Sequence, residues 1–298
     1  MKVLITGGTG TLGQELIKKF YQEWDITVFS RTELNQARLQ AIYPKIKFII
    51  GDVKDYQSVS KAVRNIDVIL HCAAMKRVDV CEANPIEAVK TNVLGTENIV
   101  MAAKEKGIKQ LVSISSDKGV EPVNVYGMTK AIQEKIVIAA GYNCARYGNV
   151  FGSRGSVVPL FIEQAKAGGP LTVTDPEMTR FILTTDQAIE LIMLALNSPM
   201  EGKVFVKKSP SAKLGDIAKS FGVEIKIIGV MIGEKKHEML ISQEETIRTE
   251  DKRDYFIITQ KINGLKKSEP YTSDIERRLT EEEIKGLIEE YKQKHNLD

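Results

Sequence analysis

The chain has 298 residues, of which 43% are hydrophobic and 27% are charged, and its 42 basic and 39 acidic side chains leave a net charge of +3. These proportions are those of an ordinary globular protein and argue against disorder, and the near balance of charge leaves no electrostatic footprint for a nucleic acid or an anionic membrane. No segment approaches the about 20 apolar residues that span a bilayer, the N-terminus lacks the apolar stretch of a signal peptide, and Cys72, Cys81 and Cys144 have no disulfide or metal spacing, so we expect a cytoplasmic, reduced protein.

In the first half of the chain, short β-branched runs alternate with helical stretches. The pattern predicts strands over residues 2–6, 25–30, 47–50, 67–72, 110–114 and 143–146, and helices over 13–21 and 85–105. Such alternation is typical of a parallel sheet with helices on both faces. We therefore predict the α/β class with a Rossmann-type sheet.

After about residue 151 this alternation weakens. Helices are predicted over 157–167, 185–197, 214–221 and 281–292, strands over 203–206 and 224–228, and a solvated loop over the charged run 250–254. The expected organisation is a nucleotide-binding domain over 1–150, followed by a smaller mixed α/β substrate region over 151–298. Some segments of the second region are expected to return to the first domain.

A glycine-rich turn directly follows the first predicted strand and opens a helix. Gly7 permits the tight turn, Gly10 lets the backbone approach a pyrophosphate, and Gly13 allows close packing of the helix. The helix start offers N–H groups and a partial positive charge to phosphates. The residues predicted to hold the dinucleotide here are Gly7, Thr9, Gly10, Thr11, Leu12 and Gly13.

The end of the second strand indicates which dinucleotide is bound. NAD enzymes of this fold place an acidic residue there, whereas this chain has Ser30 and Arg31, which favour the 2′-phosphate of NADP. A charge-assisted hydrogen bond of about 1.5–3 kcal/mol corresponds to a preference of about 10- to 150-fold. Asp52 and Val53 suit the adenine edge, although Asp52 could equally be a helix cap. Ala73 and Ala74, after the fourth strand, would let the cofactor lie against the backbone.

Tyr126 and Lys130 are four residues apart at the start of a helical stretch and therefore share one face. A nearby ammonium favours the phenolate and lowers the tyrosine pKa, which makes Tyr126 a usable general base. Ser116 lies upstream, at the C-terminal end of a predicted strand, where ligands bind in open α/β sheets.

The glycine turn, Ser116, Tyr126 and Lys130 together resemble the extended short-chain dehydrogenase/reductase family. Within it, Ser115-Ser116-Asp117-Lys118 with a tyrosine eight residues later is similar to the UDP-N-acetylglucosamine 4,6-dehydratases, especially the 5-inverting enzymes of pseudaminic acid synthesis. Retaining hexose dehydratases typically have Asp-Glu at Asp117-Lys118. Blocks over 73–78, 90–96, 146–156, 178–181 and 233–238 also resemble the family, so the likeness covers most of the chain.

The resemblance implies an NADP-dependent lyase whose reaction is redox-neutral overall. Tyr126 takes the proton of the sugar 4-hydroxyl while NADP⁺ takes hydride from carbon 4, and hydride later returns to carbon 6. Lys118, with its pKa lowered by burial and neighbouring cations, is expected to remove the proton on carbon 5. Protonated Asp117 is expected to give its proton to the departing 6-hydroxyl. Reprotonation of carbon 5 by Tyr126 from the opposite face gives a UDP-4-keto-6-deoxy-L-arabino sugar.

The resemblance also implies the partners: UDP-N-acetylglucosamine or a similar UDP-sugar, and a second copy in a homo-oligomer, with no nucleic acid and no membrane. Arg180 is expected to bind the diphosphate through its planar fork of donors. Where the family usually has Arg-Pro, this chain has Met231-Ile232, which weakens UDP recognition unless Arg180 and Lys235 compensate. The residues expected at the substrate are Lys76, Asn149, Arg154, Val157, Thr179, Arg180 and Glu234, and Lys76 and Asn92 are also expected at the cofactor.

Several alternatives stay open at this point. Asn92 either orders a water near Lys130 or satisfies buried backbone, and His71 is read as a packed structural histidine. His237 and Glu238 do not form His-Glu-x-x-His, so no zinc site is predicted. A 5-retaining dehydratase or a UDP-sugar 4-epimerase needs the same tyrosine, lysine and nicotinamide but not Lys beside Asp. A non-catalytic NADP-binding sensor would keep the cofactor without turnover.

Overall fold

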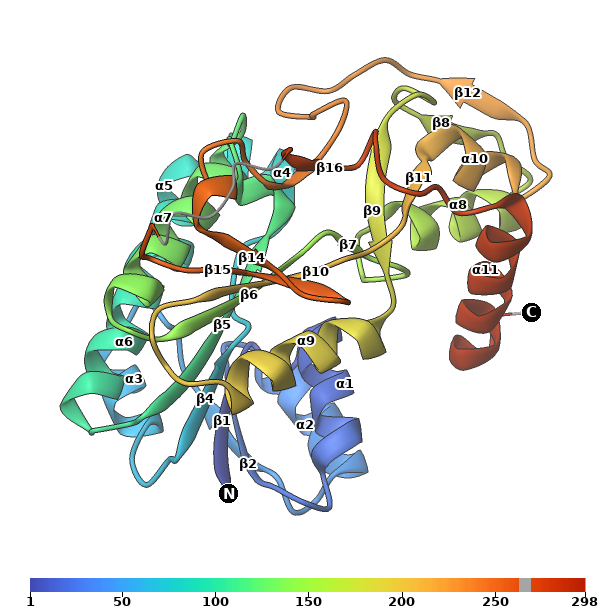
Figure 1. Ribbon diagram of the computed structural model, residues 1–298. Helices are drawn as coiled ribbons and strands as arrows, with labels where there is room; N and C mark the ends of the chain where they lie inside the picture. The colour runs from blue at the N-terminus through green and yellow to red at the C-terminus, as the bar shows by residue number, and fades with distance from the viewer. Residues whose placement is uncertain (263–268, 298) are drawn as a thin grey trace.

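Within residues 1–262 and 269–297, which the computed structural model describes, nine strands form one sheet in the order β14-β15-β10-β6-β5-β4-β1-β2-β3 (Figure 1). Neighbouring strands run parallel from β3 to β10, and β15 and β14 add an antiparallel edge. The predicted α/β class with a Rossmann-type sheet is confirmed. The strands are β1 Lys2–Thr6, β2 Asp25–Ser30, β3 Lys47–Ile50, β4 Val68–His71, β5 Gln110–Ser116, β6 Asn143–Tyr147, β10 Val204–Lys207, β14 Thr249–Asp251 and β15 Tyr255–Ile258.

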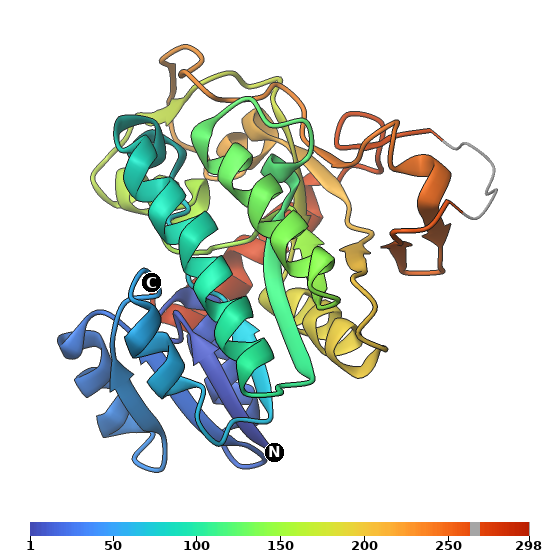
Figure 2. The same cartoon turned by 90° about the vertical axis from the view of Figure 1, so that its left-hand side faces the viewer.

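Helices cover both faces of this sheet, which is why its central strands are buried along almost their whole length. One face packs under α3 (Tyr56–Ala62), α6 (Gly95–Glu105) and α7 (Val125–Ala139), and α6 and α7 lie side by side on it (Figure 2). The other face packs under α1 (Thr11–Phe20), α2 (Glu33–Ile42) and α9 (Thr185–Asn197). Two apolar cores therefore hold the sheet between them.

A third apolar core lies beside the sheet, where α11 (Glu281–His295) packs with α8 (Val157–Lys166) and α10 (Leu214–Lys219) (Figure 1). Among the described residues, short strands outside the large sheet pair in three small sheets, in the orders β11-β9-β7, β12-β8 and β13-β16. They are β7 Asn149–Val150, β8 Leu171–Val173, β9 Thr179–Leu183, β11 Ser211–Lys213, β12 Ile225–Ile227, β13 Met239–Ile241 and β16 Tyr271–Thr272.

Two predicted elements differ in the structure. The charged run 250–254 is not simply a solvated loop, because Glu250 pairs with Ile257 and Asp251 with Phe256 in the β14–β15 hairpin. An edge strand leaves one side in water, so charged side chains are tolerated there. The predicted helix over 85–105 is divided into α5 (Pro85–Ala88), a π-helical segment (Val89–Leu94) and α6, and it follows α4 (Val78–Ala83).

Two further findings concern membrane-spanning helices and the cysteines. Among the described residues, no helix combines the length and the apolar character that crossing a membrane requires. Cys72, Cys81 and Cys144 are free thiols. Burial raises the pKa of Cys81 to about 11, so this thiol stays protonated near neutral pH.

Candidate active site

The carboxyl ends of β1, β4 and β5 meet at one edge of the sheet, and the loops that follow them carry most of the predicted site residues. β5 ends at Ser116, a 3-10 turn covers Asp117–Gly119, and α7 begins after Asn124, whose side chain accepts a hydrogen bond from the Gly127 amide (2.7 Å). A Cβ on Gly127 would lie 2.0 Å from the carbonyl oxygen of Lys118, so only glycine lets α7 approach the turn this closely. The start of α7 is thus fixed beside Lys118.

The glycine-rich turn between β1 and α1 has the shape of a phosphate cradle. Gly7 has a φ of +67°, and a Cβ on it would lie 2.8 Å from Cα of Ala73, so the turn packs directly on the chain that follows β4. A Cβ on Gly13 would lie 2.4 Å from Cα of Gly8, which keeps α1 against the turn. The first residues of α1 have no side-chain cap from Gly10, so no side chain competes with an anion for their amides.

Two cations lie beside this turn. Arg154 donates from Nη2 to the Thr9 carbonyl (2.5 Å), and its Nε is 3.4 Å from Oγ1 of Thr11. Burial and the nearby Arg154 guanidinium lower the pKa of Lys76, so the two cations are close enough to repel each other. A pyrophosphate would relieve this repulsion, and the cradle therefore fits a dinucleotide. Arg154, which was expected at the substrate, lies at the cofactor cradle instead because it is bound to the turn.

The end of β2 differs from the prediction in one respect. Ser30 is buried and its Oγ accepts a hydrogen bond from Nε2 of Gln36 (2.9 Å), so this hydroxyl is engaged by α2. Arg31 is exposed, and its Nη1 lies 3.9 Å from Oδ2 of Asp52. Nζ of Lys54 lies 3.6 Å from the same oxygen. Two cations and one carboxylate therefore border the position expected for the cofactor ribose.

Three other positions predicted at the cofactor are placed by packing. Asp52 does not cap α3, because Asp55 does so by accepting a hydrogen bond from the Gln57 amide (3.0 Å). Val53 belongs to the core under α6, and Leu12 packs against the core under α1. The side chains of Val53 and Leu12 are thus engaged in apolar packing.

Lys118 lies between two buried carboxylates. Its Nζ is 3.2 Å from Oδ1 of Asp117 and 3.2 Å from Oε1 of Glu238. Burial disfavours the charged amine, but the two carboxylates outweigh burial and raise the pKa of Lys118 above its usual value. The predicted lowering of this pKa is wrong, because the prediction considered burial and neighbouring cations but not the carboxylate of Glu238.

Each of these carboxylates keeps one oxygen without a partner. Asp117 is 1% exposed and Glu238 is 2% exposed. Oδ1 of Asp117 accepts hydrogen bonds from Oγ of Ser116 (2.7 Å) and from the Lys118 amide (2.8 Å). Among the described residues, Oδ2 of Asp117 and Oε2 of Glu238 are buried with no hydrogen-bond partner. Because such burial is costly, both oxygens indicate positions that a ligand completes.

Glu238 is not among the residues predicted at the site, since the sequence singles it out only in the rejected zinc motif with His237. The signal that could have found it is the family-like block over 233–238, which contains it.

Tyr126, in the first turn of α7, faces this cluster. Burial raises its pKa to about 12, while the Lys118 ammonium and a hydrogen bond with Ser116 act to lower it. The prediction that Lys130 lowers the pKa of Tyr126 is therefore wrong in two respects: burial raises the pKa, and the cation that acts against this rise is Lys118. Asp117 also acts on the phenol, in the opposite direction.

Lys130 is buried on the same side of α7, but its ammonium has other partners. Its Nζ donates to Oε1 of Gln133 (2.6 Å) and to the Ile114 carbonyl. Burial lowers its pKa to about 8. An amine of this kind can lose or hold its proton near neutral pH, and it lies where β5 meets α7.

Asn92 and His71 both have structural partners. Oδ1 of Asn92 accepts a hydrogen bond from the Met75 amide (2.8 Å), and its Nδ2 donates to the Met75 carbonyl (2.9 Å). Of the two roles left open for Asn92, the structure shows the second: its side chain hydrogen-bonds buried backbone groups. His71 is hydrogen-bonded to Oγ1 of Thr6 (2.7 Å) and Oγ1 of Thr96 (3.0 Å), and burial lowers its pKa to about 3. It is therefore a neutral, packed histidine.

Arg180 and Thr179 differ in how they stand to the cluster. Nε of Arg180 is 3.8 Å from Oε1 of Glu238, so the guanidinium borders the pair of buried carboxylates beside Lys118. Thr179 is fully buried, and its Oγ1 is hydrogen-bonded to Nδ1 of His237 (2.8 Å) and Oγ of Ser273 (2.7 Å). The expectation that Thr179 contacts the substrate is corrected, because its hydroxyl holds chain segments together.

The remaining predicted substrate residues surround the same edge. Asn149, on β7, has a buried Oδ1 without a partner among the described residues, and Val157 begins α8. Glu234 accepts a hydrogen bond from the Met231 amide (3.1 Å) in the loop before β13. Lys235 donates to a backbone carbonyl between β5 and α7 (2.5 Å), and burial lowers its pKa. Lys235 is thus bound to the chain between β5 and α7, near Lys118.

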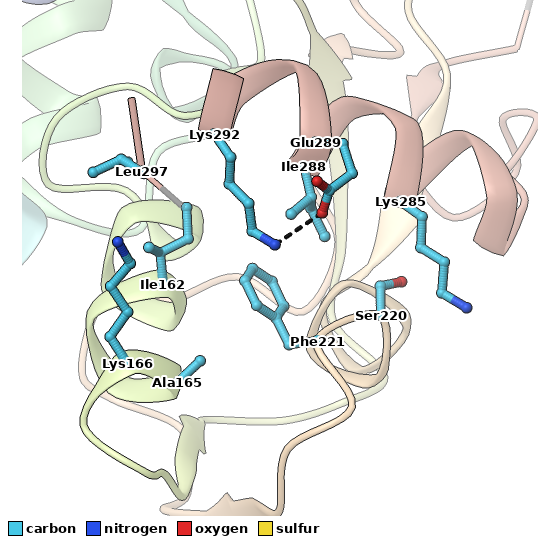
Figure 3. A pocket seen from close by; sticks show the side chains of 10 residues that line it. All are labelled: Ile162, Ala165, Lys166, Ser220, Phe221, Lys285, Ile288, Glu289, Lys292 and Leu297. Atoms are coloured by element: carbon cyan, nitrogen blue, oxygen red, sulfur yellow. Dashed lines mark hydrogen bonds and ion pairs between the residues drawn. The ribbon is translucent and has the colours of Figure 1, made fainter. Parts of the chain in front are cut away.

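A pocket of about 290 Å³ lies elsewhere, between α8, α10 and α11 (Figure 3). Phe221, Ile162 and Ile288 form its apolar lining, and Lys292 at its rim is paired with Glu289 (2.8 Å). None of the predicted site residues lines it. The candidate active site is therefore the open edge of the sheet and not this pocket.

Comparison with known proteins shows to which family the chain is similar. Residues 3–260 match the family described as polysaccharide biosynthesis protein. The UDP-glucose 4-epimerase of Rickettsia canadensis (strain McKiel) is 40% identical over 322 residues, covering 96% of this chain and 94% of that protein. The X-ray structure of Pen from Bacillus thuringiensis is 37% identical, with a TM-score of 0.92 over 97% of both chains. The dTDP-glucose 4,6-dehydratase DesIV from Streptomyces venezuelae, with NAD and TYD bound, is 22% identical and shares the fold, with a TM-score of 0.73 over 79% of this chain and 86% of that one.

Proposed function

The chain belongs to the polysaccharide biosynthesis protein family, and from this membership and the site geometry we propose that it is an NADP-dependent nucleotide-sugar 4,6-dehydratase. The proposed substrate is UDP-N-acetylglucosamine or a close UDP-sugar. The observation that carries the proposal is the position of Lys118, with its Nζ 3.2 Å from both Asp117 and Glu238 and beside Tyr126.

This cluster contains more acid–base groups than an epimerase needs. Moving a proton at the sugar 4-hydroxyl takes one group, and Tyr126 suffices for it. Elimination of water across carbons 5 and 6 needs in addition a base for the carbon 5 proton and an acid for the departing hydroxyl. Asp117, Lys118 and Glu238 supply such groups, and two of their oxygens are buried without partners among the described residues.

The first proton transfer is assigned to Tyr126. Tyr126 would act as the phenolate, which the Lys118 ammonium stabilises, and would become a neutral phenol as it takes the proton of the 4-hydroxyl. A nicotinamide, when bound, accepts hydride from carbon 4 and returns it to carbon 6. The carbon 4 ketone acidifies the proton on carbon 5, which brings the carboxylates into use. Reprotonation of carbon 5 by Tyr126 from the opposite face would give the L-arabino configuration.

The cofactor is proposed to be NADP, held by the glycine cradle and by cations at the end of β2. Arg31 and Lys54 both border this position, although Asp52 lies between them. The two cations together favour a 2′-phosphate over a bare hydroxyl. Lys76 and Arg154 would hold the pyrophosphate.

A second candidate is UDP-sugar 4-epimerase, the printed activity of the Rickettsia relative at 40% identity. That reaction would use Tyr126 and the nicotinamide and leave the Asp117, Lys118 and Glu238 cluster without a chemical role. The carboxylate cluster is the reason we rank the dehydratase first.

Incubation with UDP-N-acetylglucosamine and NADP in deuterated water, followed by NMR of the product, tests the proposal. We expect a 4-keto-6-deoxy L-arabino sugar carrying deuterium at carbon 5. A retaining dehydratase would give the D-xylo product with deuterium, and an epimerase would give a 4-epimer without it. Binding of NADP with no turnover of any UDP-sugar would indicate a sensor.

A further inference from the structure

Glu238 is a buried carboxylate that the dehydration scheme has not yet given a step. Its Oε1 is 3.2 Å from Nζ of Lys118, and its Oε2 is buried with no partner among the described residues. Ser273 fixes its backbone in both directions, because the Glu238 amide donates to Oγ of Ser273 (2.9 Å) and the Ser273 amide donates to the Glu238 carbonyl (2.8 Å). The carboxylate is therefore held in place with one oxygen available to a ligand.

Asp117 is engaged differently. Its Oδ1 receives three donors, which are Oγ of Ser116 (2.7 Å), the Lys118 amide (2.8 Å) and the Lys118 ammonium (3.2 Å). These bonds tie Asp117 to the turn that it belongs to. Within the described residues, the partners of Oε1 of Glu238 are two side-chain cations, Lys118 at 3.2 Å and Arg180 at 3.8 Å.

We propose that Glu238, and not Lys118, removes the proton on carbon 5, and that Lys118 remains an ammonium until it protonates the departing 6-hydroxyl. This inference rests on the proposed dehydratase function. It follows from the geometry, because an amine held between two carboxylates keeps its proton while an unpartnered carboxylate oxygen beside it can accept one. Among the described residues Asp117 also has such an oxygen, but the three donors to its Oδ1 favour its charged form, so Glu238 is the better base.

The step balances in protons and electrons. Oε2 of Glu238 takes the carbon 5 proton, and the electron pair of that bond passes onto the carbon 4 ketone as an enolate. The enolate then forms the double bond between carbons 5 and 6 as the carbon 6–oxygen bond breaks. The departing hydroxyl takes a proton from Lys118 and leaves as water. After the protonated carboxyl group turns, its proton passes to Nζ of Lys118, which lies 3.2 Å from Oε1 before the reaction, and both groups are restored. Carbon 5 later receives the proton that Tyr126 took from the 4-hydroxyl.

Other charged and titratable groups surround Lys118 and Glu238. They interact electrostatically with Lys118 or with the nearby Lys235, and among the described residues none of them is a second amine between two carboxylates. Within the described part of the chain these groups are Asp117 of the 3-10 turn, Glu121 after it, Tyr126 of α7, Arg180 of β9 and Lys235 of the loop before β13.

Three variants of the full-length protein separate the roles, with NADP and UDP-N-acetylglucosamine as the probes. Lys118→Arg keeps a cation that cannot act as a base, since arginine stays protonated in proteins. Lys118→Met removes the cation. Glu238→Gln removes the carboxylate at nearly constant shape. Glu244→Gln, on the same segment but exposed, is the matched control.

Two readouts are followed: formation of reduced cofactor, which reports oxidation at carbon 4, and loss of the carbon 5 proton in deuterated water. In Glu238→Gln we expect reduced cofactor to form while carbon 5 exchange and elimination fall by about 10²–10⁴-fold. We expect Lys118→Arg to exchange carbon 5 at more than about a tenth of the wild-type rate. Loss of a general base would instead lower that rate by at least about 10²-fold. Lys118→Met should lose elimination, and Glu244→Gln should match wild type.

The assignment is overturned if Glu238→Gln exchanges carbon 5 as wild type does, or if carbon 5 exchange in Lys118→Arg falls by about 10²-fold or more. Cofactor reduction by the same samples shows that the variants are folded and bind both ligands. Failure of the wild-type protein itself to eliminate water would instead overturn the proposed function, and the assignment of Glu238 with it.

Discussion

Arg146 and Glu245 form a buried, two-bond ion pair between β6 and the segment after β13, with Nη1–Oε2 at 2.7 Å and Nη2–Oε1 at 2.9 Å. The same guanidinium donates from Nε to Oε2 of Glu134 on α7 (3.0 Å). The helix that carries Tyr126 is thereby joined to the chain segment that carries Glu238. The cluster of Asp117, Lys118 and Glu238 is assembled from parts that this pair holds together.

Arg146→Met should therefore destabilise the protein by about 3–5 kcal/mol, because it leaves two buried carboxylates without their cation. Chemical denaturation of the variant beside wild type measures this loss. The exposed Arg38→Met on α2 is the control and should change stability by less than about 0.5 kcal/mol. A loss of that small size in Arg146→Met would mean that the pair is not a structural link.

The same pair predicts a pH dependence. Burial alone would raise the pKa of Glu245, but the Arg146 guanidinium outweighs it and lowers the pKa below its usual value. The stability that the pair contributes is thus present above the unfolded pKa of about 4.3 and is lost as the pH falls through the lower folded value. Denaturation between pH 3 and pH 6 should show this loss in wild type, and Arg146→Met should lack it.

Tyr126→Phe removes the only hydroxyl that we place at the 4-hydroxyl of the sugar. Turnover should fall by about 10²–10⁴-fold, as expected for a general base, while cofactor binding stays intact. Initial rates and a cofactor titration of the same preparation check both parts. Retention of more than about a tenth of the wild-type rate would remove Tyr126 from this role.

The local part of this site could be predicted from the sequence. The bounds of β1, β2 and β3 are those that the β-branched runs indicate. The glycine turn and the spacing of Tyr126 and Lys130 are equally local, since each depends on neighbours within one turn of helix or one strand end. Patterns of this kind need no knowledge of how distant segments pack.

The protonation of the site could not be predicted in the same way. The pKa of Lys118 depends on which carboxylates the fold brings to it, and Glu238 arrives from a loop fixed by Ser273. Likewise, the four-residue spacing placed Lys130 on the face of Tyr126, but its ammonium is bound by Gln133. Spacing predicts a shared face, whereas the direction of a long side chain depends on tertiary hydrogen bonds.

Cofactor choice is tested by Arg31→Ala. Because Arg31 is exposed beside the expected ribose position, its loss should weaken NADP by about 10- to 150-fold and leave NAD nearly unchanged. Titration of both dinucleotides measures the two affinities, with Arg38→Ala as a control for loss of a surface charge. Equal losses for the two dinucleotides, or a native preference for NAD, would contradict the phosphate contact.

Lys130 offers a test that needs no substrate. Burial lowers the pKa of Lys130 to about 8 from the usual 10.5, so this ammonium loses its proton more readily in the folded protein than in the unfolded chain. At pH 7, below both values, folding bears the full cost of burying the charge, and the cost declines as the pH rises through 8 towards 10.5. From pH 7 to pH 9.5 this change amounts to about 2 kcal/mol at about 1.36 kcal/mol per pKa unit. Lys130→Met has no such proton, so the free energy of unfolding of cofactor-free wild type should rise relative to the variant by that amount over this range. A stability difference between wild type and Lys130→Met that stays constant across this pH range would show that Lys130 is not desolvated. A difference that shrinks when NADP is added would show that the bound cofactor interacts with the Lys130 ammonium.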